Sequence, residues 1–197
     1  DVAGEYVKGC PMGGTTSTFT KSSVGISEPF IKQKAIENVN EGIQMITFLG
    51  HGSAAVTDID IGDTMEYNNR GKYPVFYFNG CSIGNPCLGP PDKNIKLSGE
   101  NFMKARNKGA IAFLAQSSLS ELGHVDAQIQ DFYRVAFRDN FNGSLSIGET
   151  VQKMLKDVGN YNDTLNIIQS RILFLQGDPS IQWFQPQLPD FQIDAST

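Results

Sequence analysis

The fold of this chain is decided by a short apolar run that closes on glycine and then presents a histidine, Ile46-Thr47-Phe48-Leu49-Gly50-His51-Gly52-Ser53. A second run of the same kind covers residues 74–80 and ends at Cys81. Short β-branched and aromatic runs closed by glycine are typical of buried strands in a parallel sheet. In open α/β sheets the functional site lies beyond the carboxyl ends of the strands. We therefore expect the imidazole and the thiol to share one edge of a sheet.

The rest of the chain predicts helices that cover this sheet. Helix caps, glycine stops and apolar spacing of three to four residues mark most of the boundaries. The order of elements predicts an α/β fold, a parallel sheet sandwiched between helices. The expected elements are a helix from Ser27 to Gly42, strands ending at Gly50 and Gly80, a helix over 98–108 that Gly109 ends, a strand over 110–115, a helix over 125–137, a helix opened by a capping box of Ser146 and Glu149, a helical segment over 165–175, and a short strand over 180–184.

Composition divides the chain into three parts. Residues 1–26 are rich in Gly, Ser and Thr and predict an irregular N-terminal segment, 27–184 predict one domain, and 185–197 form a Pro-punctuated tail. Three or four strands are few for a parallel sheet. We therefore expect the C-terminal part of a larger domain that is incomplete at its N-terminus.

Charge and hydropathy exclude two classes of partner. The chain has 16 Lys and Arg against 21 Asp and Glu, a net charge of −5, without a basic cluster, so a nucleic-acid partner is not expected. No apolar stretch approaches the roughly 18 residues of a membrane-spanning helix, so no membrane span is expected either.

His51 and Cys81 together predict nucleophilic catalysis by a thiolate. His51 would take the Cys81 proton as a base and later protonate the leaving amine. The backbone amides of Gly52 and Cys81 would converge on the tetrahedral oxyanion. Taken singly, a Cys at a strand end is usually a small core residue, and a His beside glycines is often an ordinary loop residue. Their coincidence at two strand ends favours a cysteine hydrolase or transpeptidase.

The loop after the third strand is the expected wall of a substrate pocket. Its predicted substrate-binding residues are Ser117, Ser118, Leu119 and Gly123; the alternative is an ordinary strand-to-helix loop. His124 begins the next helix, where the helix dipole disfavours its charged form. It is therefore expected to be a surface or pocket-rim residue rather than the base.

The acidic residues after His51 leave three roles open. Asp58, Asp60 and Asp63 could orient His51, bind a structural calcium ion, or cap a solvated turn. Their spacing lacks the glycine and the terminal glutamate of an EF-hand, which favours the turn. No cofactor is expected to be required.

Three cysteines leave the redox state open. With Cys81 as nucleophile, Cys10 and Cys87 could form a disulfide in an oxidising compartment, or all three could be unrelated thiols.

Residues 48–53 and 78–81 resemble the two signature blocks of gingipain-like cysteine peptidases of the caspase-like clan, in which one strand ends in His-Gly and the next in the nucleophilic Cys. The separation of 30 residues (81 − 51) fits that family. The resemblance covers roughly residues 40–184 and continues in three further segments, 108–115, 131–133 and 175–180. Segments 57–61 and 71–76 are more similar to the PorU-like sortases of the type IX secretion system.

This resemblance implies a caspase-like fold with His51 and Cys81 as a catalytic dyad. It also implies polypeptide clients carrying a C-terminal signal, type IX secretion components as partners, and an acyl-enzyme that passes to water or a lipopolysaccharide amine. The implied location is the periplasm, the outer-membrane surface or the exterior of a Gram-negative bacterium, which makes a Cys10–Cys87 bridge more plausible. The alternative is a catalytically inactive caspase-like module that binds secretion clients or partners.

The chain departs from the family in two places. Gingipains have an aromatic residue soon after the His-Gly-Ser block, where this chain has Ala54-Ala55-Val56. Arginine or lysine specificity is therefore not carried over. The acidic residue that sometimes supports the histidine normally precedes the region present here.

Overall fold

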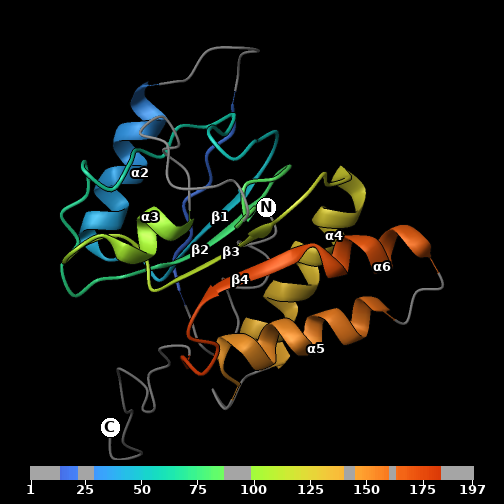
Figure 1. The fold of residues 1–197 in the computed structure, drawn as a ribbon. Helices are drawn as coiled ribbons and strands as arrows, with labels where there is room; N and C mark the ends of the chain where they lie inside the picture. The colour runs from blue at the N-terminus through green and yellow to red at the C-terminus, as the bar shows by residue number, and fades with distance from the viewer. Residues whose placement is uncertain (1–13, 22–28, 87–98, 140–144, 160–162, 183–197) are drawn as a thin grey trace, which may run out of the picture.

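Four strands form one mixed sheet in the order β1-β2-β3-β4 (Figure 1). The computed structural model describes residues 14–21, 29–86, 99–139, 145–159 and 163–182. The first three strands pair in parallel, and β4 pairs with β3 in the antiparallel direction. The strands are β1 (Met45–Leu49), β2 (Val75–Asn79), β3 (Ala112–Gln116) and β4 (Leu173–Gly177).

Helices cover both faces of the sheet, which confirms the predicted α/β sandwich (Figure 1). The sheet is mixed and not wholly parallel as predicted, because β4 runs antiparallel to β3. One face packs against α2 (Pro29–Glu41) and α3 (Gly99–Lys104). The other packs against α4 (Leu122–Tyr133), a π-helical turn η1 (Arg134–Asp139) and α5 (Ile147–Gly159). A further helix, α6 (Thr164–Arg171), packs against α4 and α5 and leads into β4. In the described part of the chain, no helix is both long and apolar enough to cross a membrane.

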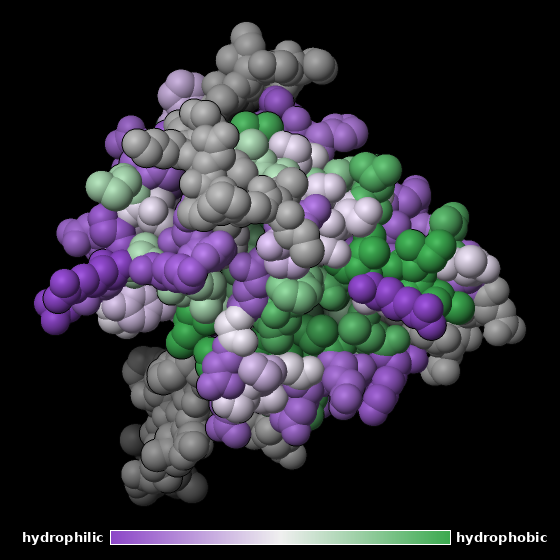
Figure 2. Space-filling model, in the orientation of Figure 1, coloured by the Kyte–Doolittle hydropathy of each residue, from purple (hydrophilic) through white to green (hydrophobic). Residues whose placement is uncertain are grey.

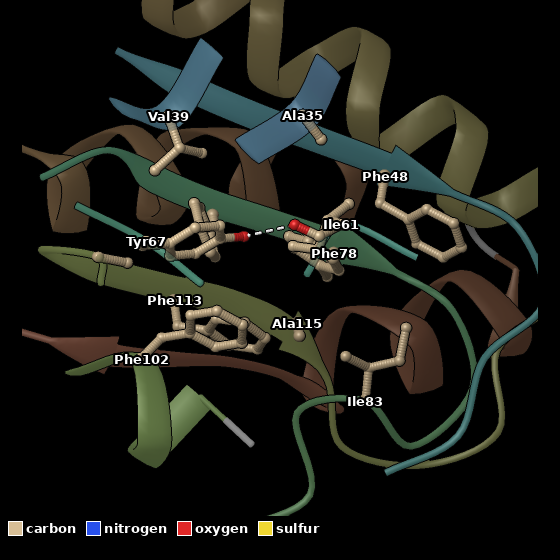
Figure 3. Close-up of a cluster of buried hydrophobic side chains, with 12 residues drawn as sticks. Ala35, Val39, Phe48, Ile61, Tyr67, Phe78, Ile83, Phe102, Phe113 and Ala115 are labelled. Atoms are coloured by element: carbon tan, nitrogen blue, oxygen red, sulfur yellow. Dashed lines mark hydrogen bonds between the residues drawn. The ribbon is translucent and has the colours of Figure 1, made fainter. Parts of the chain in front are cut away.

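The core is divided by the sheet into two apolar clusters. Every residue of β2 and β3 is buried, which explains why both strands are almost continuously apolar. On the α2 and α3 face, aromatic rings pack across neighbouring strands (Figure 3): Phe78 lies 5.6 Å from Phe48 and 5.4 Å from Phe113, centroid to centroid. On the other face Tyr77 packs against Phe132 of α4 at 4.8 Å. The two clusters make the centre of the sheet a rigid platform.

The last strand differs from the sequence prediction. The helical pattern expected over 165–175 ends at Arg171, and Leu173–Gly177 forms β4. The predicted strand over 180–184 is reduced, within the described residues, to one bridge between Ser146 and Gln182. A short apolar run is compatible with both helix and strand. The free edge of β3 selects the strand for residues 173–177, because the backbone groups at that edge need hydrogen-bond partners.

Two other helices differ at their C-terminal ends. The helix expected over 98–108 stops at Lys104, and Asn107 and Gly109 then take left-handed φ values of 61° and 95°. A Cβ on Gly109 would lie 2.0 Å from the Phe102 carbonyl oxygen, so glycine is required there. The helix expected over 125–137 changes to π geometry at Arg134, whose guanidinium is paired with Asp131 and Asp157.

Other boundaries are confirmed. α2 lies where it was expected, although Ser27 is outside the described residues. The capping box is formed: the Ser146 amide donates to Glu149 at 2.8 Å, and the Glu149 amide donates to the Ser146 hydroxyl at 3.2 Å. Cys10, Cys87 and the tail over 185–197 also lie outside the described residues.

Asn69 ties two loops together at the amino-terminal edge of the sheet. Its fully buried amide donates to the carbonyls of Lys72 (2.9 Å) and Gly109 (2.8 Å) and accepts from the Gly109 amide (3.0 Å). Asn69→Ala would leave three backbone groups unpaired, so we expect a loss of about 2–4 kcal/mol in the free energy of unfolding. Urea denaturation measures it. The neighbouring Asn68→Ala, with an exposed side chain, is the control; equal effects of the two variants would contradict this account.

Candidate active site

The ends of β1 and β2 bring His51 and Cys81 to the same edge of the sheet, as predicted. Leu49 pairs with Asn79 in register, and the Gly50 amide donates to the Asn79 carbonyl at 3.1 Å. His51 lies two residues after Leu49, and Cys81 lies two residues after Asn79. His51 is exposed and Cys81 is half-buried, so neither is sealed inside the core.

Glycine at position 80 allows the two loops to touch. A Cβ there would lie 2.8 Å from the Gly50 carbonyl oxygen, 3.3 Å from the Gly52 nitrogen and 2.7 Å from a methyl group of Ile83. Two of these three neighbours are backbone atoms, which cannot move aside as a flexible side chain can. The close approach of backbone to backbone therefore requires the absence of a side chain at Gly80.

His51 stands at the start of a tight hairpin that Asp58 holds in place. The Asp58 carboxylate accepts from the His51 amide at 2.9 Å, and the Asp58 amide donates to the His51 carbonyl at 3.0 Å. Gly52 and Thr57 lie opposite each other across the hairpin, between the Ser53-to-Val56 and Asp58-to-His51 hydrogen bonds, without bonding each other. Asp58 thus orients the backbone of His51, while the imidazole has no hydrogen-bond partner among the residues that the structure describes. The ring is free to turn toward a substrate.

The other two aspartates, Asp60 and Asp63, accept hydrogen bonds from backbone amides of the following turns, the role that the sequence analysis favoured. Asp60 accepts from the Gly62 amide at 2.8 Å and pairs with Lys32 at 3.2 Å. Asp63 accepts from the Met65 amide at 2.7 Å. In the described ranges, no group of three or more His, Cys, Asp or Glu residues could hold a metal ion. The calcium prediction gains no support from these residues.

Cys81 lies in a strained turn that is joined to the loop after β3. Ser82 has a left-handed φ of 57°, which is unfavourable for a residue with a side chain. Its amide donates to the Ser118 carbonyl at 2.9 Å, and the Gly84 amide donates to the Gln116 carbonyl at 2.8 Å. The chain after the thiol is therefore held against β3 and the loop that follows it.

The Cys81 sulfur contacts Ser120, which belongs to the predicted pocket-wall loop but was not among its predicted substrate-binding residues. The Ser120 amide lies 3.5 Å from Sγ, its hydroxyl 3.7 Å, and its carbonyl oxygen accepts from the thiol at 3.7 Å. No hydrogen bond joins the His51 imidazole to Sγ in the described structure. The sequence placed Ser120 in the segment after β3, but a serine there carries no signal that distinguishes it from Ser117 or Ser118.

The predicted substrate-binding residues have different surroundings. Ser117 is half-buried, and both its amide and its hydroxyl donate to the Ile172 carbonyl, at 2.7 and 2.8 Å. Ser118, Leu119 and Gly123 are exposed. Three of the four are thus exposed to solvent, and Ser117 anchors the loop to Ile172, the residue directly before β4.

The predicted oxyanion donors are available. In the part of the chain that the structure describes, the amides of Gly52 and Cys81 have no hydrogen-bond partner. Their use by a substrate remains a prediction.

His124 lies between two carboxylates. Its ring contacts Glu121 through Nδ1 at 2.5 Å and Asp163 through Nε2 at 3.0 Å. Hydrogen bonds to Asp163 and Glu121 hold the pKa of His124 above its ordinary value of 6.5. The two carboxylates outweigh the helix dipole, which by itself disfavours the charged ring. These carboxylates also cap α4 and α6, so His124 bridges the starts of both helices.

Comparison with known proteins identifies related folds. Residues 6–184 match the model of Peptidase family C25. The crystal structure of the Arg specific cysteine proteinase gingipain R (RGPB) superposes with a TM-score of 0.68 at 17% identity, over 83% of this chain and 38% of that one. The complex of Porphyromonas gingivalis RgpB pro- and mature domains gives 0.67 at 15% identity, with the same coverage. A third structure, described as a protease, gives 0.59 at 15% identity, over 76% of this chain and 37% of that one.

These superpositions confirm the caspase-like fold. The chain spans less than two fifths of the length of the solved structures it matches. No curated protein matches it.

The contact at Gly80 predicts that a methyl group there separates the two loops. Gly80→Ala should lower the free energy of unfolding by up to about 3 kcal/mol, because the clash is with backbone, and should change the rate at which iodoacetamide alkylates Cys81. Gly71→Ala is the control: a Cβ there would meet nothing within 4 Å, and its φ of 77° should cost about 1 kcal/mol. A Gly80→Ala protein with unchanged stability and alkylation would refute the close contact.

The raised pKa of His124 predicts pH-dependent stability. The stabilisation should be complete below about pH 6.5 and should be lost as the pH rises through the higher pKa of the folded state. We expect the difference in unfolding free energy between the wild type and His124→Gln to shrink between about pH 6 and pH 9. Urea titrations across this range measure it, and a constant difference would contradict the assignment. The pKa values of Glu121 and Asp163 are lowered by His124, so both stay charged throughout.

Proposed function

Because this chain belongs to peptidase family C25, we propose that it carries the catalytic dyad of a gingipain-like cysteine peptidase, with Cys81 as nucleophile and His51 as base. The observation that carries the proposal is the convergence of the two strand ends, with Gly80 packed against Gly50 and Gly52. This contact places an exposed imidazole and a half-buried thiol on adjacent loops at the carboxyl edge of the sheet.

The reaction follows from the groups present. His51 takes the proton of Cys81, and the electron pair left on sulfur attacks a peptide carbonyl carbon. The carbonyl oxygen becomes an oxyanion, which the amides of Gly52 and Cys81 would bind. The C–N bond then breaks as His51 returns the proton to the amine. In a structure without substrate such pairs are often apart and tighten only around substrate, and the unpartnered imidazole of His51 has the freedom to do so.

The fate of the acyl-enzyme distinguishes an endopeptidase from a transpeptidase. We propose a sortase-like activity on secreted clients with a C-terminal signal, with water or a lipopolysaccharide amine as acceptor. The similarity of segments 57–61 and 71–76 to PorU-like sortases supports this choice. It implies type IX secretion components as partners and a place in the periplasm, at the outer membrane or outside a Gram-negative cell.

Exposed apolar side chains flank the loop that contacts the thiol. Leu119 and Leu122 are 75% and 63% exposed, and Leu165 and Ile168 of α6 are 49% and 46% exposed. Buried Gln169 of α6 donates to the Leu119 carbonyl at 3.4 Å, which joins this helix to the loop. Figure 2 shows hydrophobic atoms gathered over the side where α4 and α6 lie. This surface suits apolar side chains of a polypeptide better than the arginine named for gingipain R.

A second function is favoured by two of these observations. The apolar surface and the absence of a hydrogen bond between His51 and Cys81 in the described structure also fit a module that binds secretion clients without cleaving them. The two functions differ in the reactivity of the thiol. An activated Cys81 should react with iodoacetamide faster than an unstructured cysteine, whereas an inactive module should show no such excess.

Removal of either dyad residue tests the enzyme directly. Cys81→Ala and His51→Ala should each lower cleavage of a peptide library by at least about 10³-fold, the scale of nucleophile or base loss in cysteine and serine peptidases. Mass spectrometry of the products measures it. Cys81 is half-buried with contacts of 3.5 Å or longer to Ser120, so Cys81→Ala should leave the melting temperature nearly unchanged. Undiminished cleavage by the Cys81→Ala protein would refute the mechanism.

A further inference from the structure

We propose that Ser120 is a positioning residue for the Cys81 sulfur, a role that rests on the proposed nucleophile. Its amide and hydroxyl both approach Sγ, at 3.5 and 3.7 Å, and its carbonyl oxygen lies 3.7 Å from Sγ as the acceptor of the thiol proton. One residue thus supplies two donors and one acceptor to the sulfur. Ser120 is 39 positions away in sequence, and therefore the contact exists only in the folded chain.

The contacts act differently on the two protonation states. Hydrogen bonds to a neutral sulfur are weak, and in that state the thiol donates to the Ser120 carbonyl. When the proton moves from Sγ to the His51 ring, the thiol-to-carbonyl bond is lost and the electron pair stays on sulfur. The two donors then face an anion and become stronger. Ser120 thereby holds the thiol at rest, and its two donors favour the thiolate at the same position once the proton has left.

The geometry is set by the backbone on both sides. The Ser82 amide, directly after Cys81, donates to the carbonyl of Ser118 at 2.9 Å, two residues before Ser120. Ser117 is anchored by its amide and hydroxyl to the carbonyl of Ile172, the residue directly before β4. The loops that carry the sulfur and its donors are therefore joined to each other and to the sheet.

The other side of Ser120 is held as well. Gln169 of α6 donates to the Leu119 carbonyl, and Glu121 caps α4 by accepting from the His124 amide at 3.1 Å. Since residues on either side of Ser120 are fixed by separate partners, its hydroxyl approaches Sγ without a large loss of freedom. This preorganisation distinguishes a positioning role from a chance contact on a loose loop.

The test compares two variants: Ser120→Ala removes the hydroxyl, and Ser120→Thr retains it. The readout is the rate of Cys81 alkylation by iodoacetamide against pH, with the Cys81 peptide followed by mass spectrometry so that Cys10 and Cys87 do not interfere. Ser120→Ala should alkylate about tenfold more slowly near neutral pH, the effect typical of one hydrogen bond to a charged group. Its pH profile should move to higher pH, and Ser120→Thr should restore most of the rate.

The control is Ser180→Ala, a remote serine whose hydroxyl donates to Asp178 at 2.7 Å; its profile should match the wild type. In the peptidase assay Ser120→Ala should lower kcat with KM little changed. A Ser120→Ala profile that superposes on the wild type would overturn the proposal, as would equal losses in the Ala and Thr variants with lowered melting temperatures. A wild type that cleaves no peptide while Ser120→Ala still shifts the profile would refute the peptidase and support the role of Ser120 at the sulfur.

Discussion

The contact between Gly80 and the Gly50 carbonyl is the constraint on which the candidate site depends. Parallel pairing of β1 and β2 in register brings two strand ends to one level, but side chains normally keep the following loops apart. Here the loops meet backbone to backbone, because position 80 lacks a Cβ. His51 directly follows Gly50, and Cys81 directly follows Gly80. The two residues therefore lie on adjacent loops.

The site is supported by a platform that has little freedom to move. β2 and β3 are buried on both faces, so the aromatic packing of Phe76 and Phe78 on one face and of Tyr77 on the other restrains the central strands. Asn79 and Gln116, which end these strands, are also fully buried, and Gln116 donates to Gln128 of α4 at 2.8 Å. Rigid strands therefore carry His51 and Cys81, while the exposed His51 imidazole keeps the freedom that the proposed proton transfer needs.

Contacts distant in sequence shape the surroundings of the thiol. The loop after β3 is joined to the turn after Cys81, to the start of β4 and to α6, and His124 connects the caps of α4 and α6. The apolar surface around Leu119 and the Ser120 groups that donate to the sulfur thus lie on the same anchored loop.

The sequence by itself determined the local elements of the site. Apolar runs closed by glycine identified β1 and β2, the strand ends predicted a shared edge for His51 and Cys81, and the Ser146–Glu149 box located the start of α5, because each of these signals lies within a few consecutive residues. The tertiary structure alone decided that Leu173–Gly177 is a strand, since the free edge of β3 selects it from a run that fits a helix equally well. It also decided that Ser120 meets the sulfur and that Asp163 reaches His124. Such pairs join residues 39 positions apart, and their distance depends on how the helices pack, which no local pattern of residues specifies.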